Sequence, residues 1–106
     1  GRTAEILVSA TGEFITAPFY GHLQSFFAPH SRRIKQYQII QETPRKILIK
    51  IIPDKGYSPK DTETTRRITL SIMGNLEIEI KLVNSIAPSR SGKRQVRIRK
   101  FPIKFT

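Results

Sequence analysis

One loop of the chain combines small residues, a glycine and a lysine directly before an expected strand: Ser89-Arg90-Ser91-Gly92-Lys93-Arg94. Gly92 lets a backbone approach a ligand closely, and Lys93 brings a point charge that can meet a phosphate. The loop is not a Walker P-loop, because it lacks the first glycine and precedes a strand instead of a helix. Taken alone, such a segment is more often a solvated basic loop than a site.

No other group of side chains forms a recognisable catalytic or metal-binding set. His22 and His30 lie on either side of Pro29, so one helix face cannot present both, and surface or helix-end positions are the simpler interpretation. No third ligand lies near them, and we therefore expect no metal site. The aspartates, Asp54 and Asp61, fall in or near a loop and do not support paired-carboxylate catalysis.

The charge of the chain is strongly positive and unevenly distributed. Nineteen Lys and Arg against eight Asp and Glu give a net charge of +11, and no acidic residue follows Glu79. A basic tail favours binding to phosphates of nucleotides, coenzymes, nucleic acids or lipids, without choosing among them. Two alternatives to an enzyme therefore stay open: a nucleic-acid-binding module and a non-catalytic, ferredoxin-like regulatory module. Nucleic acid is the less expected partner, because the aromatic residues are not interleaved with the basic tail as a stacking platform requires.

Length and composition predict one small domain. The chain has 106 residues, 38% of them hydrophobic, and no cysteine, which suits a reducing compartment such as the cytoplasm. No apolar run approaches the roughly 20 residues of a membrane span, so we expect no membrane insertion. The chain starts with Gly1 and its single methionine is Met73, from which we expect either a processed chain or an excised piece of a larger protein.

The first half of the chain predicts two hairpins separated by a helix. Residues 4–9 and 13–16 read as short strands around a turn at Gly12. Apolar residues spaced three and four apart predict a helix over 19–28. Residues 33–41 and 46–52 are rich in isoleucine and flank a turn at Pro44, which indicates the second hairpin.

The second half predicts a capped helix and two more strands. Ser58, Pro59 and Asp61 form a helix-start signal, and Gly74 is a natural stop after Met73. Polar and apolar residues alternate over 76–82 and again over 94–100, where we expect Val96 and Ile98 to face the core and the arginines to form a basic outer face. The fold class is α+β: an N-terminal β-hairpin and a largely antiparallel sheet covered by two helices, related to the ferredoxin-like fold.

The ordered set of motifs resembles a known enzyme family. The chain opens with Gly1-Arg2-Thr3 and an apolar strand, and it ends with the Ser-Gly-Lys loop and a basic strand. Adenylate-forming ligases carry a similar pair, a hinge motif of the form GR-x-D/E-D/E and a later SGK loop. Residues 34–41 (IKQYQIIQ) are similar to a strand of the phenylacetate–CoA ligase-like branch, which includes capsular polysaccharide biosynthesis ligases.

The resemblance implies a reaction in two steps. A carboxylate substrate attacks the α-phosphate of ATP, which is bound with Mg²⁺, and the acyl-adenylate then passes its acyl group to coenzyme A or another thiol. The chain would be the mobile C-terminal domain, residues 1–106, and its partner would be the N-terminal domain of the same polypeptide. We expect no cofactor on the isolated domain and no activity from it alone.

The family's functional residues map onto few positions of this chain. Lys93 matches the catalytic lysine of the adenylating step, with Gly92 beside it at the nucleotide. Arg2 matches the hinge arginine that contacts the nucleotide. At the hinge, Ala4 stands where the family has an acidic residue, and Glu5 is the carboxylate that follows it. No glycine-rich pantetheine loop is clearly reproduced, so the acceptor thiol stays open.

Overall fold

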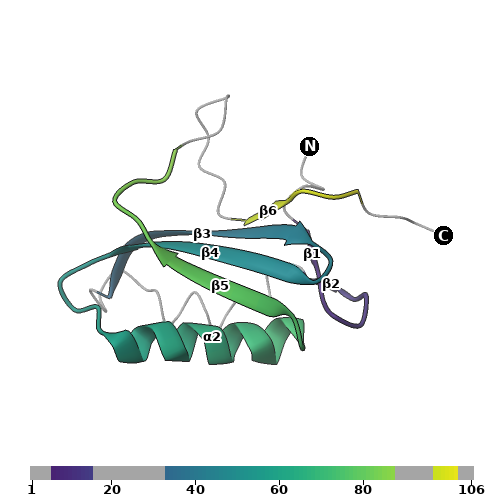
Figure 1. Cartoon of the computed structure of the whole chain (residues 1–106), viewed down its shortest axis with the longest axis horizontal. Coiled ribbons are helices and arrows are strands. Elements are labelled where there is room, and N and C mark those ends of the chain that lie inside the picture. Colours follow the sequence, from purple (N-terminus) through teal and green to yellow (C-terminus); the bar gives the residue numbers. More distant parts are fainter. Residues whose placement is uncertain (1–5, 16–32, 88–96, 103–106) are drawn as a thin grey trace.

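The computed structural model describes residues 6–15, 33–87 and 97–102 and has the α+β architecture expected from the sequence. Its described elements are a two-stranded sheet, a four-stranded sheet and one helix, labelled as in Figure 1. Helix α2 covers one face of the larger sheet (Figure 1). The other expected helix, over 19–28, lies outside the described residues.

The N-terminal hairpin is confirmed. Strand β1 (Leu7–Val8) pairs antiparallel with β2 (Phe14–Ile15). Gly12 has φ = 87°, a left-handed conformation that favours glycine. The side chain of Ser9 closes the turn, since its Oγ accepts a hydrogen bond of 3.0 Å from the Glu13 N–H.

The second hairpin forms the centre of the larger sheet. Strand β3 (Ile34–Thr43) pairs antiparallel with β4 (Lys46–Pro53), and Ile39 lies directly opposite Ile49. Side chains alternate between the two faces of a strand, so Ile47, Ile49 and Ile51 share the face toward α2. All three are fully buried, and the isoleucine-rich composition of β4 is explained by this position.

Helix α2 (Pro59–Met73) connects β4 to the parallel strand β5 (Glu77–Leu82). Its start follows the predicted signal: Pro59 is the first helical residue, and the Asp61 Oδ2 accepts a hydrogen bond of 2.9 Å from the Ser58 N–H. The helix ends at Gly74, whose φ of 85° follows the predicted stop. These signals are local, which is why the sequence locates both ends of the helix.

The larger sheet is mixed, whereas we expected a largely antiparallel one. Its order is β5-β4-β3-β6, and the last strand, β6 (Arg97–Arg99), is parallel to β3. The helical connection makes β5 parallel to β4, because a crossover helix returns the chain to its starting edge. The β4–α2–β5 unit joins adjacent strands, so within the described residues it is not the split βαβ of a ferredoxin-like core.

The orientation of β6 is opposite to the expected one. Arg97 lies opposite Ile39 and Arg99 opposite Gln41, which places both arginines on the face toward α2. Ile98 lies opposite Ile40 on the other face and is half-buried. Alternating polarity alone cannot identify the inner face of a strand when the inner side offers hydrogen-bond acceptors to arginine, as it does here.

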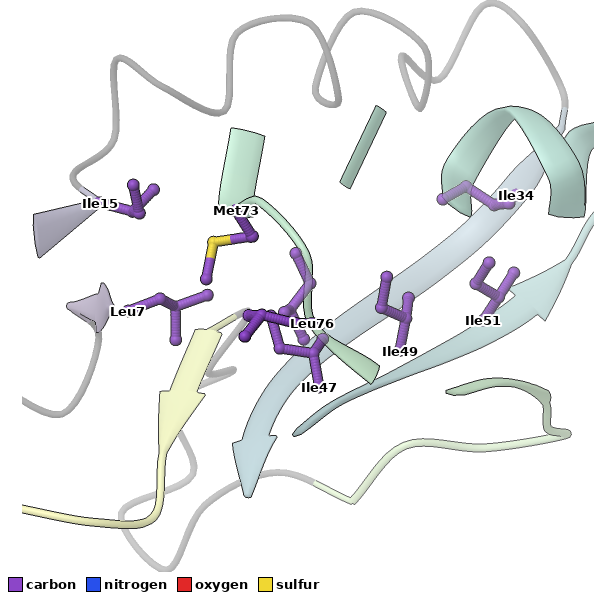
Figure 2. Packing of buried hydrophobic residues seen from close by; sticks show 9 residues of the cluster. Leu7, Ile15, Ile34, Ile47, Ile49, Ile51, Met73 and Leu76 are labelled. Carbon is purple, nitrogen blue, oxygen red and sulfur yellow. The ribbon is translucent and has the colours of Figure 1, made fainter. Parts of the chain in front are cut away.

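The core lies between the sheet, α2 and the N-terminal hairpin. Figure 2 shows Leu7 and Ile15 of the hairpin beside Met73 of the helix and Ile47 of the sheet. The hairpin is also hydrogen-bonded to the end of the helix, where the Ala10 N–H donates to the Met73 carbonyl at 2.7 Å. The two sheets therefore form one packed unit.

Candidate functional site

The structure does not describe the residues that the sequence assigns to the site. Arg2, Ala4 and Glu5 precede the first described residue, and Gly92 and Lys93 fall in the gap between 87 and 97. What the structure does describe is the pair of elements that follow these motifs, β1 after the hinge motif and β6 after the lysine loop.

Arg99 connects the first described segment of the chain to the last one. Its Nη1 donates a hydrogen bond of 2.6 Å to the Ile6 carbonyl, and its Nε donates one of 2.6 Å to the Phe101 carbonyl. The guanidinium carbon also lies 5.9 Å from the centre of the Phe101 ring, within cation–π range. One side chain thus holds the segment after the hinge motif against the strand after the lysine loop.

Gln41 makes the second connection between these elements. Its side chain is fully buried, its Oε1 accepts a hydrogen bond of 2.8 Å from the Val8 N–H, and its Nε2 donates one of 2.7 Å to the Val8 carbonyl. The side-chain amide therefore pairs with β1 as a neighbouring strand would. The backbone carbonyl of Gln41 accepts a further bond of 3.0 Å from the Lys100 N–H. Gln41 is the last residue of the pattern 34–41 and has a structural role.

Tyr37 and Arg97 lie on the same face of the sheet. Burial raises the pKa of the Tyr37 phenol, and the positive charge of Arg97 opposes that rise. The net rise of the Tyr37 pKa shows that desolvation outweighs the attraction between phenolate and guanidinium. Tyr37 also packs against the apolar core, and both side chains of the pair are half-buried.

Asp61 is the most buried carboxylate of the described residues, and its bonds are structural. The Arg33 Nη1 donates to its Oδ1 at 2.7 Å while the Ser58 N–H occupies the other oxygen. No group of three or more His, Cys, Asp and Glu side chains comes together in residues 6–15, 33–87 and 97–102. The bonds of Asp61 thus join Arg33, just before β3, to the start of α2.

A shallow groove of about 390 Å³ lies over the first turns of α2. Its described lining comes from one helix only: Pro59, Lys60, Glu63, Thr64 and Arg67. A binding pocket needs polar groups that converge from several elements, and this groove does not bring them together within the described part of the chain.

No helix among the described residues has the length and apolar character to cross a membrane.

Sequence reasoning identified neither Gln41 nor Arg99 as positioning residues. A signal for Gln41 was present, because a glutamine inside an isoleucine-rich strand must find hydrogen-bond partners when buried. For Arg99 no comparable signal exists, since its partner, the Ile6 carbonyl, lies 93 residues away.

Comparison with known protein families gives a match over most of the chain. A family model described as the CapK C-terminal domain matches residues 7–100. The matched range contains the pattern 34–41, Gly92 and Lys93, and it begins after Arg2, Ala4 and Glu5. No curated protein and no solved structure matches the chain.

Proposed function

This chain belongs to the CapK C-terminal domain family, and from that premise we propose that it is the mobile C-terminal domain of an ATP-dependent, carboxylate-activating ligase. The ligase forms an acyl-adenylate and then transfers the acyl group to coenzyme A or another thiol. The observation that carries the proposal is the Ser-Gly-Lys loop, residues 91–93, inside the range that the family model matches.

Lys93 is the catalytic residue of this proposal. An ammonium group at the α-phosphate stabilises the negative charge that develops as a carboxylate attacks, and a preorganised charge of this kind is a large contribution to catalysis. Gly92 lets the loop backbone approach the nucleotide. Arg2 contacts the nucleotide from the hinge, where Ala4 and Glu5 form the pivot.

The contacts of Arg99 and Gln41 support a common location for the hinge and the lysine loop. Arg99 of β6 bonds the Ile6 carbonyl just before β1, and the Gln41 side chain bonds β3 to β1. Arg2 lies four positions before Ile6, and Lys93 lies four positions before Arg97. Four residues span at most about 14 Å. A rotation about the hinge would therefore move β1 and β6, the strands that follow the two motifs, together.

The partners follow from the same proposal. The N-terminal domain of the same polypeptide would supply the carboxylate pocket and most of the ATP–Mg²⁺ site. Domain closure would bring Lys93 to the nucleotide only after the substrates are bound, which excludes water from the reacting groups. A chain without cysteine suits the cytoplasm, where ATP and coenzyme A are available.

The test uses the full-length polypeptide and a panel of carboxylates. We expect ATP-dependent release of pyrophosphate by the full-length protein and only background release by the 106-residue chain. Thioester formation is then followed with coenzyme A and with other thiols. Robust turnover by the 106-residue chain alone would contradict the division of the site between two domains.

A further inference from the structure

Strand β5 forms one edge of the larger sheet (Figure 1). Among the described residues, β4 is its one hydrogen-bonded neighbour. An edge strand presents a row of backbone N–H and C=O groups that another strand can pair with. The sequence of β5, Glu-Ile-Glu-Ile-Lys-Leu, determines which strand fits.

The backbone of β5 divides its residues into two sets. The Glu77 N–H donates to the Arg45 carbonyl and the Val83 N–H donates to the Ile51 carbonyl, both at 2.8 Å. Backbone groups alternate in direction along a strand, so the odd-numbered residues are bonded to β4. The N–H and C=O groups of Ile78, Ile80 and Leu82 therefore point to the outer edge.

We propose that β5 pairs antiparallel with β5 of a second copy of this chain, about a two-fold axis at Ile80, and that one sheet thereby continues through both copies. In this register Ile80 lies opposite Ile80 of the second copy, and Ile78 lies opposite Leu82. Both are pairs in which the outward-pointing N–H and C=O groups meet. The proposal concerns a different surface from the lysine loop and does not depend on the proposed function.

Charge complementarity selects this register. With the axis at Ile80, Glu79 lies opposite Lys81 of the second copy, and the symmetry makes the same pair twice. A shift of the axis by one residue toward Glu79 pairs Glu77 with Lys81 but places two glutamates directly opposite each other at the axis. A shift toward Lys81 places two lysines opposite each other. Opposite charges across a strand pair stabilise it, and like charges destabilise it.

The ion pairs on this face already lead to the edge. Lys46 of β4 lies 3.9 Å from Glu42 and 3.5 Å from Glu79, and Glu79 lies 3.9 Å from Lys81. The charges alternate in sign from Glu42 of β3 through Lys46 of β4 to Glu79 of β5, and Lys81 follows Glu79 along the same edge strand. In the proposed register, Glu79 of the second copy lies opposite Lys81, so a negative charge follows the positive one and the alternation continues.

The exposure of an apolar side chain on β5 supports the same partner. Leu82 is 54% exposed, the largest exposure among the large hydrophobic side chains described as exposed. Pairing with Ile78 of the second copy would cover it. A two-fold, self-complementary interface closes on itself, so it produces a dimer and not an open fibre.

The test compares the oligomeric state of charge variants by sedimentation equilibrium. The unaltered 106-residue chain should dimerise with increasing concentration. Lys81→Glu makes the charges at positions 79 and 81 both negative, and Glu79→Lys makes them both positive. Each variant alone should have a dimer Kd raised about tenfold, because two symmetry-related attractions become repulsions. Lys55→Glu, in the loop before α2, is the matched control and should leave the Kd unchanged.

A mixture of the two variants provides the decisive measurement. Lys81→Glu and Glu79→Lys chains together restore opposite charges at both positions, so the mixture should form heterodimers more tightly than either variant forms homodimers. Circular dichroism establishes that each variant is folded. Amide hydrogen exchange adds a residue-level measurement: the amides of Ile78, Ile80 and Leu82 should become protected as concentration rises, while those of Glu79 and Lys81 are protected throughout.

Three results of these binding measurements would overturn the proposal. They are a chain that stays monomeric at every concentration, a dimer that responds equally to Lys81→Glu and Lys55→Glu, and a mixture with no preference for heterodimers. Protection of Ile80 that is independent of concentration would also overturn it, because the edge would then be covered within one chain.

Discussion

Arg33 and Asp61 connect the start of strand β3 to the start of helix α2 through a hydrogen bond of 2.7 Å between Nη1 and Oδ1. The Asp61 side chain is 4% exposed, and its other oxygen accepts the bond from the Ser58 N–H. One carboxylate thus caps the helix and binds the sheet. Its negative charge also lies at the positive end of the helix dipole.

We predict that Asp61→Asn lowers the free energy of unfolding by about 1.5–3 kcal/mol, the range for hydrogen bonds to charged groups. Asparagine keeps an acceptor for the Ser58 N–H but loses the charge that pairs with Arg33. Urea unfolding followed by circular dichroism measures the change. Glu63→Gln is the control: Glu63 pairs with Arg66 at 3.0 Å on the exposed side of the same helix, so its loss should cost less than about 1 kcal/mol. Equal effects of the two variants would contradict the structural role of Asp61.

The second prediction concerns the buried amide that holds β1. Gln41→Leu has a similar volume but leaves the N–H and carbonyl of Val8 without their side-chain partner, at about 1–3 kcal/mol for each unsatisfied group. The amides of β1 should exchange faster with solvent, which NMR measures residue by residue. Gln36→Leu, on the same strand, should cost less than about 1 kcal/mol. Unchanged protection of Val8 in Gln41→Leu would show that β1 is held by other contacts.

The parts of the fold that follow from short-range signals could be predicted from the sequence. The start of α2 at Pro59, its stop at Gly74 and the turn at Gly12 each depend on a few neighbouring residues, and all three are confirmed. The half-buried strand expected over 76–82 is confirmed as β5, although its last residue, Leu82, is exposed.

The parts that depend on distant residues could not be predicted. Alternating polarity predicts an outer face for the arginines of β6, but the carbonyls of Ile6 and Phe101 are the acceptors that bring Arg99 to the inner side. The parallel pairing of β6 with β3 likewise depends on which strand lies at the free edge, and no local pattern encodes that choice. The assignments of Arg2, Ala4, Glu5, Gly92 and Lys93 stay predictions, because the structure does not describe these residues.

A pH dependence follows from Tyr37. Burial raises the pKa of its phenol above the usual value of 10.0, so the folded chain keeps this proton at a pH where the unfolded chain releases it. The contribution to the free energy of unfolding is therefore complete below about pH 10 and is lost as the pH rises through the folded-state pKa. Tyr37→Phe should reduce this loss of stability at alkaline pH, measured by urea unfolding at a series of pH values.

Arg97 provides the internal control for this effect. Its positive charge lowers the Tyr37 pKa, so Arg97→Met should raise that pKa further. The chain has three tyrosines, and the ultraviolet difference between the titrations of each background with and without Tyr37→Phe isolates the signal of Tyr37. A Tyr37 titration that moves to lower pH in Arg97→Met would contradict the arrangement of the two side chains.

The last prediction concerns Lys93 and rests on the proposed function. In the full-length protein, Lys93→Ala should slow acyl-adenylate formation by about 10²–10³-fold, the cost of removing one preorganised group that stabilises developing charge. Thiol transfer should be far less affected, because the proposed rotation of the domain moves the lysine away for the second step. The two steps are separated by supplying synthetic acyl-adenylate and following thioester formation directly. Lys55→Ala, an exposed lysine in the loop before α2, is the matched control and should leave both steps unchanged. Equal loss in both half-reactions would indicate a damaged fold, which thermal melting of the variant detects. If neither half-reaction lost rate, the Ser-Gly-Lys loop would be a solvated basic loop without a catalytic role. The main support for the proposed function would then be removed.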